Sequence, residues 1–174
     1  MKYMKLLTLL PSVLVIGCAD LSTQFKAAEE PADGPRARIR IVANALVKAV
    51  PGKNCIDYHT PGAGTIFGGI VGSRGYRGRS LNIPNAESFD ASSMGEMYAS
   101  AGKPIALQFL TTPESRYSCG VGVTFTPKVD HDYQVKMILD PSHMECTAEV
   151  RSLSDPNEHV DMHPVDSCTK QGNP

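Results

Sequence analysis

The chain has 174 residues, five cysteines, no tryptophan and a formal net charge of −1 at pH 7. This near-neutral charge gives no bulk attraction to nucleic acid or to an anionic membrane surface, so we expect no nucleic-acid partner. Any membrane attachment has to come from an apolar or covalently attached group. The length suits one domain with a hydrophobic core of its own.

The first 17 residues have the pattern of an export signal. Lys2 and Lys5 give a positively charged start, and residues 6–16 are mostly apolar. That run is shorter than the roughly 20 apolar residues that a membrane-spanning helix needs. A short apolar segment that follows lysines and ends at small residues is typical of a cleaved signal peptide. The sequence therefore predicts a signal peptide over residues 1–17.

The signal ends in Val15-Ile16-Gly17-Cys18, which resembles the lipobox of bacterial lipoprotein precursors. The resemblance implies that Cys18 becomes the first mature residue and carries a diacylglycerol and usually an N-acyl chain such as palmitate. Stable anchoring takes more than one acyl chain, so this modification would attach the protein permanently. Ala19 follows the cysteine where enteric-type lipoproteins retained in the inner membrane have an aspartate. We therefore expect the outer membrane, with the protein facing the periplasm.

Residues 18–35 are expected to be the lipidated cysteine and a flexible tether. Small and charged residues dominate this segment, and Pro31, Gly34 and Pro35 interrupt any helix. As a random coil, such a tether has an r.m.s. reach of roughly 20–25 Å. The folded domain is predicted to cover residues 36–174.

From Arg36 to Ile41, arginines alternate with apolar residues, which is the pattern of a strand with one polar and one apolar face. We interpret the arginine side as a solvated face. Further candidate strands end at Pro, Gly, Asn or Asp clusters, and their spacing of roughly 8–12 residues is typical of an all-β sandwich or barrel. The expected strands are 36–50, 65–71, 79–83, 96–99, 105–111, 117–126, 133–139, 145–153 and 160–165.

One segment also allows a helix. Residues 90–101 could form one with Asp90 as its N-cap, in competition with an extended conformation around Met97 and Tyr98. No other segment sustains an apolar period of 3.6 residues for long. We therefore predict an all-β domain, a small antiparallel β-sandwich of about seven to nine strands.

The body of the chain also resembles small β-sandwich domains of uncharacterised bacterial envelope lipoproteins. The resemblance rests on three strand-and-turn segments: Ala101-Gly-Lys-Pro-Ile-Ala-Leu107, Cys119-Gly-Val-Gly-Val-Thr-Phe-Thr-Pro127 and Asp132-Tyr133. It implies the same fold class as the strand pattern.

Four cysteines remain in the mature chain, and an even number in an exported protein predicts two disulfides. Three pairings are possible. A hairpin about residues 155–157 would bring Cys146 opposite the neighbourhood of Cys168. In a meander, Cys119 and Cys146 would lie two strands or about 10 Å apart, beyond the roughly 4.4–6.8 Å between Cα atoms that a disulfide tolerates. We therefore predict Cys146–Cys168 and, by elimination, Cys55–Cys119.

Two groups of residues are candidate binding sites. The glycine-rich segment 61–80 carries Arg74, Arg77 and Arg79, and these guanidinium groups together with exposed backbone N–H groups could bind an anionic glycan or a lipid headgroup. The other interpretation of this segment is a flexible loop with a glycine-weakened edge strand.

The second group is His159, Asp161 and His163, in the pattern His-x-Asp-x-His. On a strand, all three side chains would project from one face and could bind Zn²⁺ or Cu²⁺. The same residues would also suit the solvated face of an edge strand, where charges deter pairing with other chains.

Nucleophilic catalysis has little support, because the chain lacks the G-x-S-x-G motif and has no spare cysteine once two disulfides form. We therefore predict a lipid-anchored envelope protein without enzymatic activity or cofactor. Its expected role is binding or scaffolding, with an envelope protein or an anionic glycan or lipid as partner. The alternatives are a metal-binding envelope protein that uses His159, Asp161 and His163, and a hydrolase of envelope polymers.

Overall fold

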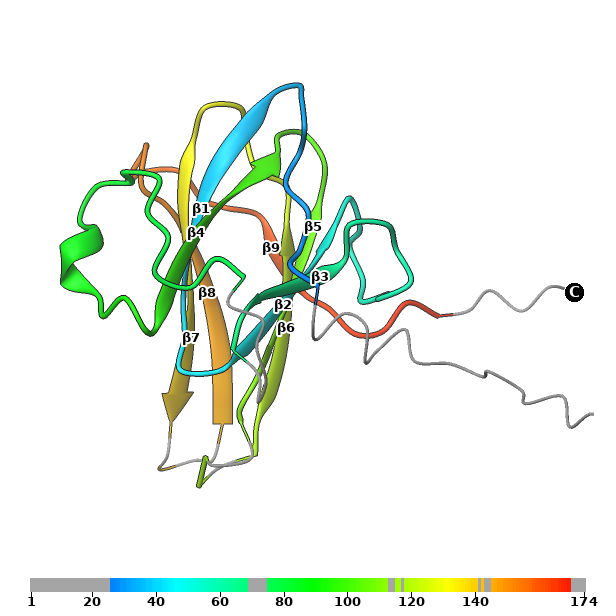
Figure 1. Cartoon of the computed structure of the whole chain (residues 1–174), viewed down its shortest axis with the longest axis vertical. Helices are drawn as coiled ribbons and strands as arrows, with labels where there is room; N and C mark the ends of the chain where they lie inside the picture. The colour runs from blue at the N-terminus through cyan, green and yellow to red at the C-terminus, as the bar shows by residue number, and fades with distance from the viewer. Residues whose placement is uncertain are drawn as a thin grey trace, which may run out of the picture.

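The residues that the structure describes form nine strands in two sheets that pack face to face (Figure 1). The computed structural model describes residues 26–68, 75–112, 115–116, 118–140, 142 and 145–169. The predicted β-sandwich is confirmed. No helix within these residues is long and apolar enough to cross a membrane. The elements are β1 (Arg36–Val42), β2 (Leu46–Pro51), β3 (Gly64–Phe67), the short 3₁₀ helix Ala86–Ser88, β4 (Met94–Ser100), β5 (Ile105–Leu110), β6 (Gly120–Phe125), β7 (Asp132–Asp140), β8 (Glu145–Ser152) and β9 (Met162–Pro164).

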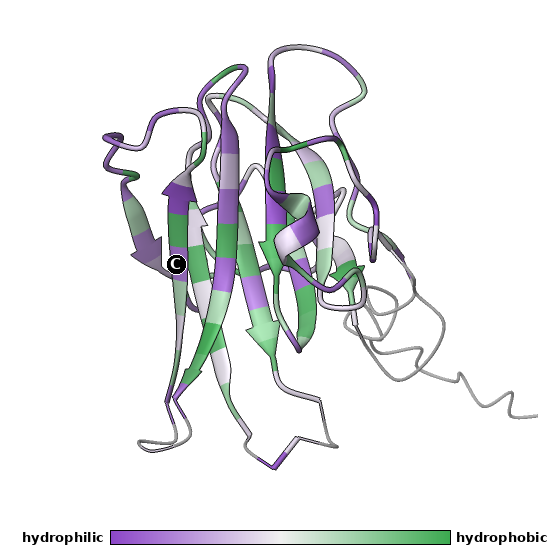
Figure 2. Ribbon diagram, turned by 90° about the vertical axis from the view of Figure 1, so that its left-hand side faces the viewer, coloured by the Kyte–Doolittle hydropathy of each residue, from purple (hydrophilic) through white to green (hydrophobic). Residues whose placement is uncertain are grey.

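One sheet has the strand order β4-β1-β7-β8 and the other β3-β2-β5-β6-β9. Neighbouring strands are antiparallel except for β1 and β7, which are parallel. Polar and apolar residues alternate along several strands, as the purple and green bands in Figure 2 show. The apolar side chains meet between the sheets, where Ile39 and Ile41 pack with Val47, Phe109 and Val135 in one buried cluster.

The predicted strand 36–50 is two strands that belong to different sheets. The chain crosses from β1 to β2 between residues 43 and 45, where Ala43 and Ala45 are both buried. These small side chains allow the backbone to pass close to the core. After the crossing, β2 directs Val47 and Ala49 into the same core that β1 fills from the other side.

One expected strand is wrong, because residues 79–83 are part of a loop. The expected strand 96–99 is confirmed as part of β4, and the helix that residues 90–101 also allowed does not form. Asp90 closes a turn instead of capping a helix, since its carboxylate accepts the Ser92 N–H at 2.7 Å. The extended conformation wins because β4 pairs with β1 along its full length, from Met94 opposite Val42 to Ser100 opposite Arg36. Tertiary pairing overrides weak local helix propensity.

Both predicted disulfide pairings are wrong. Cys55 is bonded to Cys168 and Cys119 to Cys146, with Cα–Cα distances of 5.0 and 6.2 Å. The meander argument fails because β6 and β7 lie in opposite sheets. Cys119 therefore faces Cys146 of β8 across the sandwich rather than two strands away in one sheet. This bridge joins the two sheets at the side where β6 packs against β8.

The other disulfide holds the C-terminal segment on the outer face of the five-stranded sheet. After β8 the chain does not fold back as a hairpin; it crosses to the other sheet, pairs with β6 as β9 and reaches the β2–β3 connection. There Ile56 forms a bridge with Ser167, next to the Cys55–Cys168 bond. A second apolar cluster lies beneath this contact and contains Val50, Ile56, Ala63 and Ala106.

The folded domain begins before Arg36, so the expected tether is wrong for residues 26–31. Ala27 forms a bridge with Thr65 of β3, and Ala28 is only 1% exposed. The Glu30 carboxylate accepts the Tyr98 N–H of β4 at 2.7 Å. Residues 26–31 therefore close the flank of the sandwich between the edge strands β3 and β4, whereas residues 1–25 lie outside the described part of the chain.

This contact predicts that residues 26–31 contribute to stability. We expect the free energy of unfolding of a chain that starts at Arg36 to be about 2–4 kcal/mol lower than that of a chain that starts at Lys26. The shorter chain loses several backbone hydrogen bonds and the burial of Ala28. Urea denaturation of both chains measures this difference. A chain that starts at Ala19 is the control and should match the Lys26 chain. Equal stability of all three would show that the segment does not pack on the domain.

Candidate functional site

The arginines of β1 form the predicted solvated face only in part, because Arg36 is exposed whereas Arg40 is buried. Arg40 is 1% exposed and its partner Glu96, on the neighbouring strand β4, is fully buried. The Arg40 Nε and Nη2 atoms lie 2.9 and 2.8 Å from the same Glu96 oxygen, Oε1. A pair of charges removed from water in this way is stable only if its remaining donors and acceptors are also satisfied.

Residues 79–90, here called the covering loop, satisfy that requirement. The Arg40 guanidinium donates to the carbonyl oxygens of Ile83 and Pro84, the latter at 2.8 Å. The second Glu96 oxygen accepts the backbone N–H of Leu81. The loop therefore lies over β1 and β4 because the buried pair provides its hydrogen-bond partners, and it appears in green beside these strands in Figure 1.

The other two arginines of β1 have different environments. Arg38 binds both carboxylate oxygens of Asp132 at 2.7 Å and donates to the Leu81 carbonyl at 3.0 Å. The hydrogen bonds that Arg38 donates to the Asp132 carboxylate raise the pKa of Arg38, against the opposing effect of burial. Arg36 is exposed and lies over the Tyr98 ring, 5.2 Å from its centroid. Only the first arginine of the row is therefore fully accessible to a partner.

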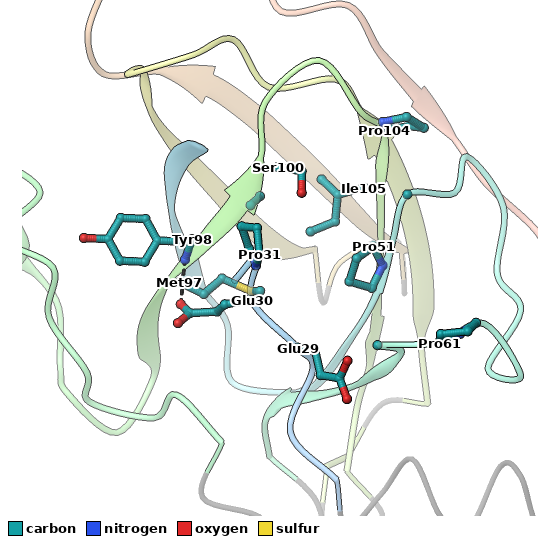
Figure 3. A pocket seen from close by; sticks show the side chains of 13 residues that line it. Glu29, Glu30, Pro31, Pro51, Pro61, Met97, Tyr98, Ser100, Pro104 and Ile105 are labelled. Atoms are coloured by element: carbon teal, nitrogen blue, oxygen red, sulfur yellow. Dashed lines mark hydrogen bonds between the residues drawn. The ribbon is translucent and has the colours of Figure 1, made fainter. Parts of the chain in front are cut away.

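A small cavity of about 180 Å³, here called the flank pocket, lies beside residues 29–31 (Figure 3). The buried side chains of Met97 and Ile105 line it, together with half-buried Pro31 and Pro51. Glu29 and Glu30 also line it. Figure 3 shows the Glu30 carboxylate turned toward the backbone of Tyr98, to which it is hydrogen-bonded. Glu29 is exposed and forms a surface ion pair with Lys26.

The flank pocket is smaller than the about 300–1,000 Å³ of typical small-molecule sites. It has room for one side chain of a partner or for a small organic group. Its apolar lining favours an aliphatic or aromatic group, because the carboxylates of Glu29 and Glu30 are already paired with Lys26 and Arg79. Proline walls have little side-chain entropy to lose when a partner binds, which makes the cavity largely preformed.

Of the three arginines in the predicted anion site, only Arg77 and Arg79 lie within the described residues. Arg74 lies outside the described residues. Arg77 is exposed and its backbone forms a bridge with Gly95 of β4. Arg79 donates to Glu30 at 2.7 Å and lies over the Tyr76 ring, so its charge is already paired. The ion pair between Arg79 and Glu30 therefore fastens the N-terminal segment to the loop that begins at residue 79.

The structure does not assemble His159, Asp161 and His163 as a metal site. The strand β9 covers only residues 162–164, so His159 precedes it and does not share its face. His163 Nε2 lies 3.2 Å from Asp161 Oδ1, with both side chains exposed. All three residues line one open hollow of about 360 Å³. Within the described part of the chain, no group of three His, Cys, Asp or Glu side chains could hold a metal ion.

Glu158, which the sequence analysis did not single out, is the strongly perturbed acid of this region. Its side chain is 5% exposed and lies 2.8 Å from Lys128 Nζ and 3.1 Å from His131 Nδ1. Burial raises the pKa of Glu158, but hydrogen bonds from Lys128, Ser152 and His131 outweigh it and lower the pKa from 4.5 to about 2. In the sequence, Glu158 follows the turn residues 155–157 and has no recognisable motif. In the fold, its contacts with Lys128 and His131 hold the β8–β9 connection in place.

Comparison with known proteins adds no assignment. No protein-family model matches the chain, and no curated protein matches it in sequence. The function is therefore inferred from the residues and their arrangement.

The buried pair can be tested by removing one partner. We expect Arg40→Ala to lower the free energy of unfolding by about 3–5 kcal/mol, because Glu96 is left as an uncompensated buried charge. Urea denaturation measures the loss, and faster amide exchange at Leu81 would show that the covering loop opens. Arg36→Ala is the matched control on the same strand face and should cost less than about 1 kcal/mol. Similar losses in both variants would contradict the assigned role.

Glu158 predicts a specific dependence of stability on pH. Because its folded pKa lies below the ordinary value of 4.5, its contribution is present above about pH 4.5 and is lost as the pH falls toward about 2. We expect this loss to be about 1–3 kcal/mol, reduced by the solvent around Lys128. Denaturation at pH 7 and pH 3 measures it. Glu158→Gln should shrink the difference between the two values, whereas Glu87→Gln, which removes a charge at an exposed site, should not.

Proposed function

We propose that the protein is a lipoprotein of the bacterial envelope, anchored through Cys18 and facing the periplasm, with a binding or scaffolding role that is not enzymatic. The lipobox-like ending Val15-Ile16-Gly17-Cys18 supports the anchor. Two disulfides in the folded domain support an oxidising compartment, since such bonds are rare in the reducing cytosol.

The observation that carries the proposal is this lipobox-like ending before Cys18, and the short chain between Cys18 and the domain determines how an anchored domain would sit. Lys26, the first described residue, is only eight residues after Cys18, and the next residues already pack on β3. Eight extended residues span at most about 28 Å. An anchored domain would therefore stay close to the bilayer, with the flank between β3 and β4 nearest to the anchor.

A protein partner suits this geometry better than an anionic glycan or lipid headgroup. Glu29, Glu30 and Pro31 line the flank pocket and follow the anchor closely in the chain. The pocket has an apolar lining, and the carboxylates beside it are already paired with Lys26 and Arg79, so it suits a single apolar side chain of an envelope protein. Arg79, one of the residues expected to bind an anion, is paired with Glu30.

Processing at Cys18 tests the anchor. We expect the intact mass of detergent-extracted mature protein to show acylation at Cys18, and Cys18→Ser to leave an uncleaved precursor. Ala19→Asp is the informative companion variant, because it should keep the lipid while retaining the protein in the inner membrane. An unmodified Cys18 in the mature protein would contradict the proposal. A lipidated wild type in the inner membrane would overturn only the outer-membrane assignment.

A further inference from the structure

The two flanks of the sandwich are closed to different degrees. At the β3–β4 flank, residues 26–31 and the Arg77–Gly95 bridge cover the edge strands. At the opposite flank, β8 is the edge of its sheet, and none of the described strands pairs with its outer side. The Cys119–Cys146 bond joins the sheets near one end of β8 but does not add a strand to it.

The hydrogen-bond pattern shows which backbone groups of β8 point away from β7. Antiparallel pairs alternate between hydrogen-bonded and non-hydrogen-bonded positions. Leu153 donates its N–H to the Asp132 carbonyl at 2.7 Å, which makes this a hydrogen-bonded position. Counting back two residues at a time along the ladder, odd-numbered residues of β8 face β7. The N–H and C=O groups of Cys146, Ala148 and Val150 therefore point to the open edge.

Apolar side chains on this flank are incompletely covered. Val121, Cys146, Ala148 and Val160 pack against the main core but are only partly buried. Val121 lies on β6 and Cys146 and Ala148 on β8, two strands that pack against each other. A strand added to β8 would therefore bury apolar surface in addition to forming backbone hydrogen bonds.

The side chains on the exposed face of β8 are self-complementary. An antiparallel copy of β8 centred on Ala148 sets Glu145 opposite Arg151 of the other copy, and the reverse, with Thr147 opposite Glu149. All four are exposed. Ala148 is also a residue whose backbone groups face the open edge, so a two-fold axis there coincides with a hydrogen-bonded pair. Opposite charges directly across an antiparallel ladder are favourable, whereas like charges are not.

We propose that the protein forms a symmetric dimer by antiparallel pairing of β8 with β8 of a second copy, which joins the two four-stranded sheets into one. A two-fold axis perpendicular to the sheets leaves both N-terminal flanks at the same level along the axis. Two copies anchored in one membrane could then pair, and this last point rests on the proposed function. Confinement to a membrane raises the effective concentration of the partners.

The test uses two differently tagged copies of the full chain, co-expressed and co-purified in detergent. Wild-type copies should co-purify. Glu145→Arg in both copies places an arginine opposite Arg151 of the other copy. Arg151→Glu in both copies places two glutamates opposite each other. Each change should reduce recovery of the complex about tenfold. A copy with Glu145→Arg mixed with a copy with Arg151→Glu restores both opposite-charge pairs and should recover the complex.

The mixed pair separates a lost contact from a folding defect, because both variant chains are present in it. Glu87→Arg, an exposed charge reversal in the covering loop, is the control and should leave recovery unchanged. Absence of co-purification between wild-type copies would overturn the dimer, as would a mixed pair no better than the like pairs. Detergent removes the bilayer, so the result is independent of the membrane, and the intact mass reports separately whether Cys18 is lipidated.

Discussion

The buried ion pair between Arg40 and Glu96 determines much of the structure around it. Two charges taken out of water are unfavourable unless every donor and acceptor finds a partner. Here β4 provides the carboxylate and the covering loop provides backbone carbonyl and N–H groups, at Ile83, Pro84 and Leu81. The pair and the loop depend on each other, because neither is satisfied when the other is absent. Removing one partner of such a buried pair is strongly destabilising, because the other is left as an uncompensated buried charge.

The covering loop in turn positions the N-terminal segment. Arg79 at the start of the loop binds Glu30, and the same Glu30 oxygen accepts the Tyr98 N–H of β4. Glu30 is therefore the residue where the loop, the edge of the sheet and the N-terminal segment meet. The flank pocket lies against this junction, and Met97 and Tyr98, which line it, follow Glu96 on β4. Its shape therefore depends on the strand that carries the buried carboxylate.

The sequence predicted the fold class and the position of most strands, because alternation and turn residues are local signals. It could not predict the disulfides, since their pairing depends on which sheet each strand joins, and β6 and β7 belong to different sheets. It also assigned Arg40 to solvent, because alternation distinguishes two faces of a strand but not whether a loop covers one of them. Glu158 carried no signal at all, as its partners at Lys128 and His131 come from a distant turn.

The two flanks of the sandwich differ in how their edge strands are protected from pairing with other strands. An uncovered edge strand invites pairing, and proteins usually protect such edges with charges or covering segments. The edge at β4 is covered by backbone and by the Glu30 carboxylate. The edge at β8 carries only the charges of Glu145, Glu149 and Arg151, and these repel many strands while matching an inverted copy of themselves. The same charges that discourage indiscriminate pairing can therefore select one partner, and they lie on the flank opposite the proposed anchor.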